Sequence, residues 1–294
     1  KYLNKKKTDL IIIHGDRMEA LAGAIAGTFN NIHVAHIEGG EISGTIDESI
    51  RHSVSKLSHF HFVSNEESKK RLVQMGENKK TIFIIGSPDL DIMKKKNLPK
   101  INEAKKFYNV KFENYSIMIF HPVTTDKNEN KKNLEIINKL VNINKGQNFI
   151  CINPNNDPGS ISFLKLYKKL KKNKNFISFP SMRFEYFLTF LKNANYIIGN
   201  SSAGVREAPF YGKNCVNVGT RQNNRVKSSN LIYNSQNYSQ VIKNIRKIIK
   251  KGNIEYRDKN FGFGNSDKKM QKILSGKNFW KLNIQKIFND LDKI

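Results

Sequence analysis

From Leu10 to Ser64, short apolar runs alternate with polar, glycine-rich turns. These apolar runs each have the length of a strand: LIIIH at residues 10–14, IHVAH at residues 32–36 and FHFVS at residues 60–64. Amphipathic stretches of helix length follow them, beginning near Arg17, Asp47 and Glu66. This alternation predicts a parallel sheet with helices on both faces.

The same alternation resumes after a basic, polar stretch between Asp91 and Glu113, which we interpret as an interdomain connection. A length of 294 residues also favours two domains with separate cores. We expect a first domain with linker over residues 1–112, a second over residues 113–277 and a C-terminal helix over residues 278–294. Further strands are expected at residues 81–85, 116–120, 148–153, 175–179, 195–198 and 214–218, giving about four strands in the first domain and about five in the second.

Composition excludes several function classes. The net charge of +26 comes mostly from lysines dispersed over solvated helix faces, without arginines interleaved with aromatics, so we predict no specific nucleic-acid binding. No apolar run approaches the roughly 18 residues that span a bilayer, so we expect a soluble, cytoplasmic protein. Cys151 and Cys215 lie in separate apolar runs, which predicts buried thiols and no metal site.

Acids, imidazoles and an arginine gather between His14 and His61. Asp16, Glu38 and Glu48 occupy three successive connections after strands or at a helix start. Parallel folding brings such positions to one sheet edge, where crowded carboxylates acquire different pKa values and can divide the roles of acid and base. Arg51, three residues after Glu48 on the same helical face, could pair with it or contact a phosphate. The alternative is that each acid is solvated or caps a helix.

Another candidate site follows the strands of the second half. Ser201, Ser202 and Gly204 come after a predicted strand and open a helix, an arrangement that favours an anion such as phosphate; the alternative is an ordinary helix cap. Glu207 could accept hydrogen bonds from ribose hydroxyls or merely interact with the helix dipole. His121 ends another strand, where it could contact a leaving phosphate or be structural.

These residues lie in motifs by which the chain resembles the UDP-N-acetylglucosamine 2-epimerase family, and most closely its hydrolysing branch. The matching motifs are spread from about Asp9 to Ile273 in the family's order. They are HGDR at residues 14–17, HIEGGE at 36–41, SGTID at 43–47, IRH at 50–52, HPVTTD at 121–126, GNSS at 199–202, GVRE at 204–207 and GTRQ at 219–222.

The resemblance implies a GT-B-like α/β architecture, with two Rossmann-type domains and the active site in the cleft between them. It implies that UDP-N-acetylglucosamine and water become N-acetylmannosamine and UDP, through loss of the C2 proton, departure of UDP, a 2-acetamidoglucal intermediate and addition of water. It also implies a UDP-sugar as the partner, no cofactor or metal, no membrane contact and a homodimer or homotetramer.

The matching motifs imply that Asp16 and Glu38 are the acid and base at C2, with Glu48 sharing that role. Arg51 would orient the carboxylates or a phosphate, and His121 would contact the pyrophosphate. The matching nucleotide-contact positions are Ser201, Ser202, Gly204, Glu207, Arg221 and Arg225, with Arg221 and Arg225 close enough to compete for one role.

One departure concerns the start of the sequence. Family members open with a strand and a phosphate-contacting loop of the Gly-Thr-Arg-Pro-Glu type, and nothing like it precedes Lys1. We therefore expect that the sequence lacks an N-terminal βαβ portion of its family.

Other functions stay open at this point. The sugar nucleotide could be a UDP-linked 2,4-diacetamido-6-deoxy sugar or a GDP-linked sugar of legionaminic acid synthesis. From other classes, a polyanion binder built on a sugar-nucleotide fold and a retaining glycosyltransferase are alternatives that the crowded acids of the first half disfavour.

Overall fold

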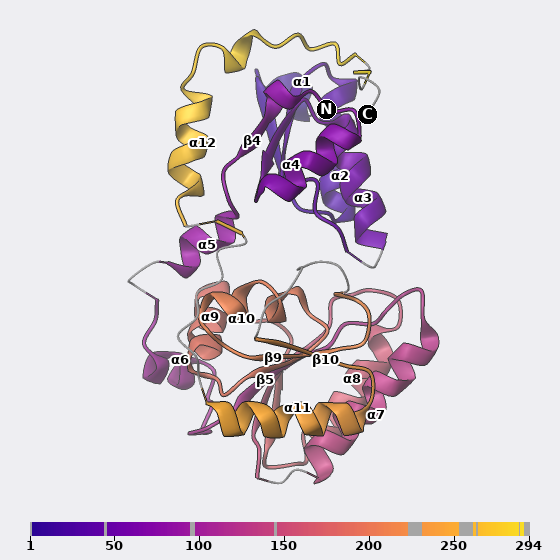
Figure 1. Cartoon of the computed structure of the whole chain (residues 1–294), viewed down its shortest axis with the longest axis vertical. Helices are drawn as coiled ribbons and strands as arrows, with labels where there is room; N and C mark the ends of the chain where they lie inside the picture. The colour runs from indigo at the N-terminus through magenta and orange to yellow at the C-terminus, as the bar shows by residue number, and fades with distance from the viewer. Residues whose placement is uncertain are drawn as a thin grey trace. The chain divides into compact units, whose positions relative to one another are not determined.

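The computed structural model describes residues 2–43, 46–94, 98–143, 146–222, 231–252, 261–262, 264–287 and 289–290 (Figure 1). The chain divides into two compact units, each with its own parallel sheet. Unit 1 comprises residues Lys1–Lys94 and Lys259–Ile294, and unit 2 comprises Lys95–Asp258.

Unit 1 contains, in its described residues, a four-stranded parallel sheet in the order β1-β2-β3-β4. Each predicted strand of the first half is confirmed to within about a residue at its ends. The strands are β1 (Leu10–His14), β2 (His33–Ile37), β3 (Phe60–Val63) and β4 (Ile82–Ile84). Because the strands are parallel, their carboxyl ends lie along one edge of the sheet, and each leads into a polar loop.

Helices cover both faces of this sheet, as the sequence predicts for a parallel sheet. α2 (Met18–Phe29), α3 (Ile46–Leu57) and α4 (Glu66–Gln74) pack on one face through residues such as Val34 and Leu72. α12 (Ser266–Leu274), from near the chain's end, covers the other face and lies beside α5 (Pro88–Met93) (Figure 1). The remaining short elements are α1 (Tyr2–Lys5), η1 (Lys79–Thr81) and η3 (Phe279–Lys281).

The helix predicted over residues 278–294 is wrong for the residues that the structure describes. A single 3-10 turn, η3, is followed by non-helical chain over residues 282–287. Side chains of unit 1 hold this segment: Phe279 stacks on Phe60 at a ring distance of 3.8 Å, and the ring nitrogens of His33 and His59 contact the carbonyls of Leu282 and Ile284. These contacts to the carbonyls of Leu282 and Ile284 hold the segment in a non-helical conformation and outweigh the helical spacing of its apolar residues.

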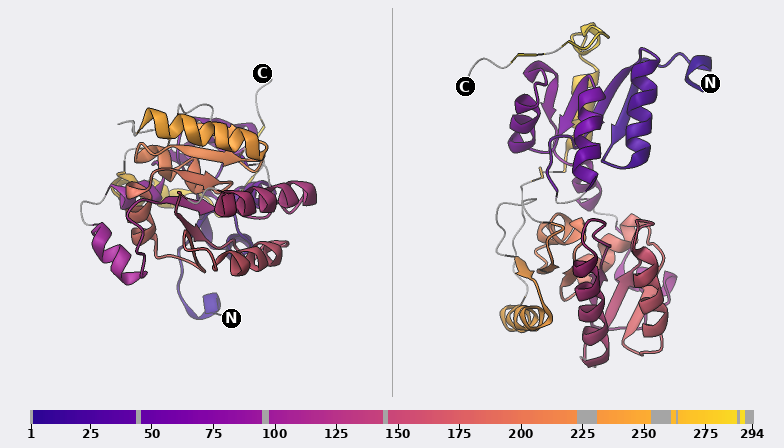
Figure 2. Two further views of the ribbon diagram at one scale, coloured as in Figure 1. Left: turned by 90° about the horizontal axis from the view of Figure 1, so that it is seen from below. Right: turned by 90° about the vertical axis from the view of Figure 1, so that its right-hand side faces the viewer.

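Unit 2, coloured magenta to orange in Figure 2, contains in the part of the chain that the structure describes a six-stranded parallel sheet in the order β10-β9-β8-β5-β6-β7. Five of its strands match predicted strands: β5 (Ser116–Ile119), β6 (Phe149–Ile152), β7 (Phe176–Phe179), β8 (Ile197–Gly199) and β9 (Cys215–Val218). The sixth, β10 (Ile232–Ser235), has too few apolar residues to be recognised from sequence and pairs at the sheet edge with β9. The chain leaves β5 in one direction and returns at its other side as β8, so the strand order reverses between these two strands.

One face of the second sheet is covered by α7 (Lys127–Ile143), α8 (Ser160–Leu170) and α11 (Tyr238–Lys251), which form one apolar cluster with the strands. The other helices are α6 (Ile101–Phe107), α9 (Phe184–Asn193), η2 (Ser202–Gly204) and α10 (Glu207–Phe210). α6 packs against α9 and therefore groups with unit 2, whereas its basic, polar sequence predicts part of a linker that belongs to the first domain.

Both cysteines are buried free thiols in strands, Cys151 in β6 and Cys215 in β9, as predicted. Burial raises the pKa of each thiol to about 12, so both remain protonated. Among the described residues, no helix is long and apolar enough to cross a membrane.

Candidate active site

A buried arginine organises the carboxyl edge of unit 1. Arg51 lies in α3 and is 1% exposed. Its Nη1 donates to the carbonyl of Glu41 at 2.9 Å, and its Nη2 donates to the Ser43 hydroxyl at 3.2 Å and to the carboxylate of Asp16. A planar guanidinium can hold several partners in fixed directions, which an ammonium group cannot do. Arg51 therefore fixes Asp16 and the chain over residues 41–43 against one another.

Glu48 joins the same network through the backbone rather than through Arg51. Its Oε2 accepts a hydrogen bond from the Ser43 N–H at 2.6 Å, and its Oε1 lies 3.7 Å from Nε2 of His52, one helical turn further on. The spacing of Arg51 and Glu48 allows them to pair, but Arg51 donates to Asp16 while Glu48 lies beside His52. Arg51 and Glu48 thus share Ser43 as a hydrogen-bond partner, and Arg51 links this pair to Asp16.

Glu38 has a separate set of contacts at the same edge. It follows β2, is 7% exposed and has a φ of 66°, a left-handed conformation that non-glycine residues seldom adopt. Its Oε1 accepts from the Ser87 hydroxyl at 2.5 Å, and its Oε2 lies 3.2 Å from Nε2 of His14. The carboxylate is therefore held by His14, which ends the neighbouring strand β1, and by Ser87, which follows β4 at the far edge of the sheet.

His36 is a fixed neutral imidazole beneath this edge. Burial lowers the pKa of His36 to about 3, an effect that outweighs the hydrogen bond to the Gly15 carbonyl. Because a carbonyl only accepts, the Nε2 atom 2.9 Å from the Gly15 oxygen carries the proton, and Nδ1 accepts from the Ser55 hydroxyl at 2.9 Å. His36 therefore positions the loop that leads to Asp16 and does not titrate near neutrality.

The turn between Glu38 and Glu41 requires glycine. Gly40 has a φ of +74°, and a Cβ there would lie 2.2 Å from the carbonyl oxygen of Ser68. The absence of a side chain lets the turn pack directly on α4, where Arg71 donates to the Gly40 carbonyl at 3.1 Å. Glu41 is then placed with its Oε1 accepting from the Ser64 hydroxyl at 3.0 Å.

His61 ends the polar stretch that begins at His14, but its side chain contacts Glu77 and not the acids at the carboxyl edge. It is fully buried in β3 and its Nε2 lies 3.0 Å from Oε2 of Glu77. Glu77 is also paired with Lys56 at 2.9 Å and Lys286 at 2.6 Å. Burial alone would raise the pKa of Glu77, but the hydrogen bonds and charges of His61 and Lys286 lower it to about 2. This cluster attaches the C-terminal segment to the core of unit 1.

In unit 2, His121 and Asn200 meet where the strand order reverses. His121 follows β5 and Asn200 follows β8, and these adjacent strands are the point at which open α/β sheets bind ligands. The Asn200 Oδ1 accepts from the His121 N–H at 2.7 Å, and its Nδ2 donates to the His121 carbonyl at 2.8 Å. The Asn155 N–H donates to Nδ1 of His121 at 3.4 Å, so in the neutral ring Nε2 carries the proton.

Side chains from the loop after β9 close around Asn200. Its carbonyl accepts from Nη1 of Arg221 at 3.2 Å and from Nε2 of Gln222 at 2.9 Å. The buried carboxylate of Glu129 in the first turn of α7 accepts from the backbone N–H and hydroxyl of Thr220 at 3.1 and 2.7 Å. Arg221 is thereby anchored on the loop that contains Asn200.

The helix expected near Gly204 is broken into η2 and α10. Ser201 caps η2, its hydroxyl accepting from the Ala203 N–H at 3.3 Å. A Cβ at Gly204 would lie 2.4 Å from Sγ of Cys215, so the small residue here allows η2 to pack against β9. Pro209, which lacks a backbone N–H, sits inside the four-residue α10 and helps to explain why no long helix forms.

The other predicted nucleotide contacts lie at the same end of unit 2. Ser202 begins η2 and Glu207 begins α10, where the carboxylate is 8% exposed. Burial and, to a lesser extent, the charge of Glu207 raise the pKa of Tyr211 above its ordinary value. Arg225 lies outside the described residues.

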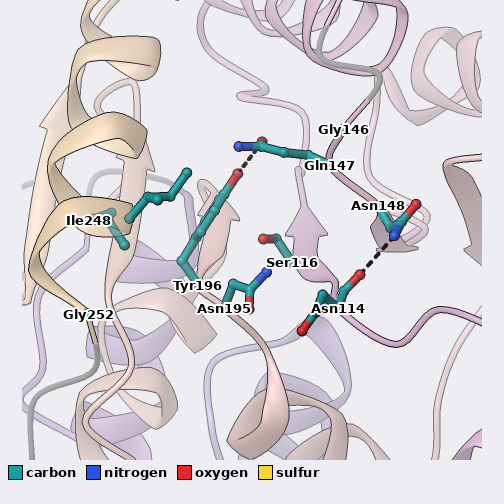
Figure 3. A pocket seen from close by; sticks show the side chains of 10 residues that line it. Asn114, Ser116, Gly146, Gln147, Asn148, Asn195, Tyr196, Ile248 and Gly252 are labelled. Atoms are coloured by element: carbon teal, nitrogen blue, oxygen red, sulfur yellow. Dashed lines mark hydrogen bonds between the residues drawn. The ribbon is translucent and has the colours of Figure 1, made fainter.

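A cavity of about 540 Å³ lies at the opposite edge of the second sheet, beside the amino ends of β5, β6 and β8 (Figure 3). Tyr196 donates to Oε1 of Gln147 at 2.7 Å, and Asn148 donates to the Asn114 carbonyl at 2.9 Å across it. The residues that line it are all uncharged, so they provide no acid or base. The chemistry-bearing residues are at the carboxyl edges instead.

Two parallel sheets flanked by helices, each with polar residues at its carboxyl edge, define a GT-B-like α/β protein. The crystal structure of a UDP-GlcNAc 2-epimerase from Methanocaldococcus jannaschii, in complex with UDP-GlcNAc and UDP, has the same fold. Its TM-score is 0.77 at 23% identity, over 93% of this chain and 77% of that one.

The family model described as UDP-N-acetylglucosamine 2-epimerase matches residues 1–275. The chain belongs to this family, which confirms the resemblance seen in its motifs. It is 46% identical over 287 residues to a UDP-N-acetylglucosamine 2-epimerase of Neisseria meningitidis, covering 97% of this chain and 75% of the relative. It is 35% identical over 273 residues to a UDP-N,N'-diacetylbacillosamine 2-epimerase (hydrolyzing) of Legionella pneumophila, covering 90% and 70%.

Four residues at the carboxyl edges of units 1 and 2 are not predicted as site residues from the sequence. Asn200, Ser87 and Glu129 contact residues far from them in sequence, so no local spacing predicts these contacts. Ser43 contacts Glu48 and Arg51, which follow it within eight positions. The dipeptide Ser87-Pro88 does carry a signal, because serine followed by proline after a strand is typical of a helix start.

Proposed function

We propose that this protein is a hydrolysing UDP-N-acetylglucosamine 2-epimerase that releases N-acetylmannosamine and UDP. The observation that supports this most is the carboxyl edge of unit 1, where three acids have different environments. Asp16 is paired with a buried arginine, Glu38 is buried between a serine and a histidine, and Glu48 is partly exposed. Different environments let neighbouring carboxyl groups take the roles of acid and base.

In the proposed reaction one carboxylate, Asp16 or Glu38, removes the proton at C2 while UDP leaves C1, and a double bond forms between C1 and C2. Water then adds at C1, and a second acid delivers a proton to C2 from the opposite face. Glu48 supports this exchange and Arg51 holds Asp16 in position. Each positioned acid or base would contribute about 10²–10⁴-fold to the rate.

The unit 2 residues are proposed to hold the nucleotide. His121 would donate from Nε2 to the departing pyrophosphate, with its ring oriented by the Asn155 N–H. Ser201, Ser202, Arg221 and Arg225 would contact phosphate oxygens, and Glu207 would accept from ribose hydroxyls. Gly204 would allow close packing of this loop on the sheet.

Incubation with UDP-N-acetylglucosamine in D₂O, followed by NMR, tests the proposal. We expect N-acetylmannosamine with deuterium at C2 and an equal amount of UDP. Asp16→Asn and Glu38→Gln should slow the release of UDP by about 100-fold or more, whereas Glu113→Gln, at an exposed position, should not. Formation of UDP-N-acetylmannosamine without UDP would indicate the non-hydrolysing reaction, and a product without deuterium would rule out proton transfer at C2.

A second candidate substrate is a UDP-linked 2,4-diacetamido-6-deoxy sugar. The similarity to the Legionella enzyme named for UDP-N,N'-diacetylbacillosamine favours it. Comparing kcat/KM for UDP-N-acetylglucosamine, the UDP-linked diacetamido sugar and its GDP-linked counterpart would decide among them. A preference of tenfold or more for one diacetamido substrate would replace UDP-N-acetylglucosamine in the proposal.

A further inference from the structure

Ser87 occupies a helix-capping position without using its hydroxyl as a cap. It precedes Pro88 at the start of α5, where a serine oxygen usually accepts from a backbone N–H of the first turn. The structure has no side-chain cap hydrogen bond there, and the hydroxyl instead donates to Oε1 of Glu38 at 2.5 Å. Both residues are almost fully buried, Ser87 at 1% and Glu38 at 7% exposed.

The carboxylate that receives this bond has a constrained backbone. Glu38 combines a φ of 66° with an N–H that donates to the Phe62 carbonyl at 2.9 Å. The other carboxylate oxygen faces His14, a side chain that is 44% exposed. Ser87 therefore contacts Glu38 from the buried side and His14 contacts it from the solvent side.

Ser87 is itself held by the segment that returns to unit 1 near the chain's end. Its N–H donates to the Phe261 carbonyl at 2.7 Å. The preceding Gly86 has a φ of +91°, and a Cβ at Gly262 would lie 2.8 Å from the Gly86 Cα. This backbone contact fixes the direction from which the Ser87 hydroxyl reaches Glu38.

We propose that Ser87 is a positioning residue for Glu38, holding its carboxylate in the orientation needed for proton transfer at C2. This inference rests on the proposed function, because Glu38 acts on substrate only in that reaction. A hydroxyl donor also stabilises the ionised carboxylate, so Ser87 affects the pH at which Glu38 becomes active as a base. A misplaced catalytic group can cost on the order of 100-fold in rate.

The test compares Ser87→Ala, which removes the donor, with Ser87→Thr, which keeps it. In Ser87→Ala we expect kcat for UDP release to fall by about 10- to 100-fold, with KM changed by less than about twofold. The acidic limb of the kcat profile should move to higher pH by about one unit. Ser87→Thr should keep the wild-type limb, and Ser275→Ala, which loses an exposed hydroxyl bonded to Gln271, should match the wild type in both kcat and pH profile.

Two further measurements keep the outcome decisive. Dividing the rate at each pH by the folded fraction, measured by circular dichroism at that pH, lets the acidic limb be read even if a variant is less stable. His14→Gln, measured in parallel, separates titration of the imidazole from that of the carboxylate. If the wild type releases UDP and Ser87→Ala has the same kcat and pH profile as the wild type, the role of Ser87 alone would be overturned. If the wild type releases no UDP, the proposed function would be overturned together with the role of Ser87.

Discussion

The guanidinium of Arg51 donates to the carboxylate of Asp16 and joins α3 to the loop that follows β1. Arg51 is 2% exposed at its side chain, whereas Asp16 is 25% exposed. The charge of Arg51 is therefore buried and compensated, while one side of Asp16 remains accessible. This arrangement suits a group that must be held firmly and still meet a substrate.

Replacing Arg51 by methionine should reduce both folding stability and activity. Breaking a buried ion pair costs about 3–5 kcal/mol, and the partial exposure of Asp16 lowers the expected loss to about 2–4 kcal/mol. Urea unfolding would measure the loss, and UDP release should fall at least about tenfold. Arg51→Lys should recover stability only in part, because an ammonium cannot reach Asp16, Ser43 and the Glu41 carbonyl together. The same free energy of unfolding and the same rate of UDP release in Arg51→Met and in an exposed control, Arg246→Lys, would contradict the expected role of Arg51.

Asn200→Asp should weaken nucleotide binding. The change keeps the acceptor for the His121 N–H but places a carboxylate oxygen against the His121 carbonyl, where an amide now donates. Loss of that donor and the added negative charge near a phosphate should reduce UDP affinity about tenfold or more, as calorimetric titration would show. Asn142→Asp, on the exposed surface of α7, is the matched control. Unaltered UDP affinity in Asn200→Asp would argue against a nucleotide site beside His121.

Glu77 should contribute to acid unfolding. Its folded-state pKa of about 2 lies below the ordinary value of 4.5, so the folded state favours the ionised form. The resulting stability, about 3 kcal/mol, is fully present above pH 4.5 and is lost as pH falls towards 2. Urea unfolding between pH 2 and 7 should therefore show a shallower pH dependence in Glu77→Gln than in the wild type. An exposed control, Glu135→Gln, should keep the wild-type slope, and an unchanged slope in Glu77→Gln would refute the assignment.

Gly40→Ala should be strongly destabilising. A Cβ would lie 2.2 Å from a backbone oxygen of α4, which cannot move aside without displacing the helix, and the residue has a positive φ. We expect a loss of more than about 2 kcal/mol in the free energy of unfolding, with lower UDP release from the displaced Glu38 and Glu41. Gly146→Ala, where a Cβ meets nothing within 4 Å, should change stability by less than about 0.5 kcal/mol. Similar melting temperatures for the two variants would disagree with the geometry of this turn.

The apolar runs of the sequence predict the strands well because a buried parallel strand needs a continuous apolar run. LIIIH became β1 at the predicted residues, and FICI and CVNV became buried strands of unit 2. β10 was missed because a short strand at a sheet edge needs little apolar sequence. The C-terminal segment was mispredicted because its helical spacing competes with Phe60, His33 and His59, which are remote in sequence.

Strand periodicity and ordered motifs are local properties of a chain, so the α/β class, the family and the acids that follow β1 and β2 are predictable from residue order alone. Tertiary structure decided which partner each charged group received: Arg51 binds Asp16 and not Glu48, His61 binds Glu77, and Ser87 reaches Glu38 across 49 positions of sequence. Hydrogen bonds between buried polar groups depend on which strand ends become neighbours in space. That adjacency is set by the order of strands in the sheet and cannot be read from residue spacing.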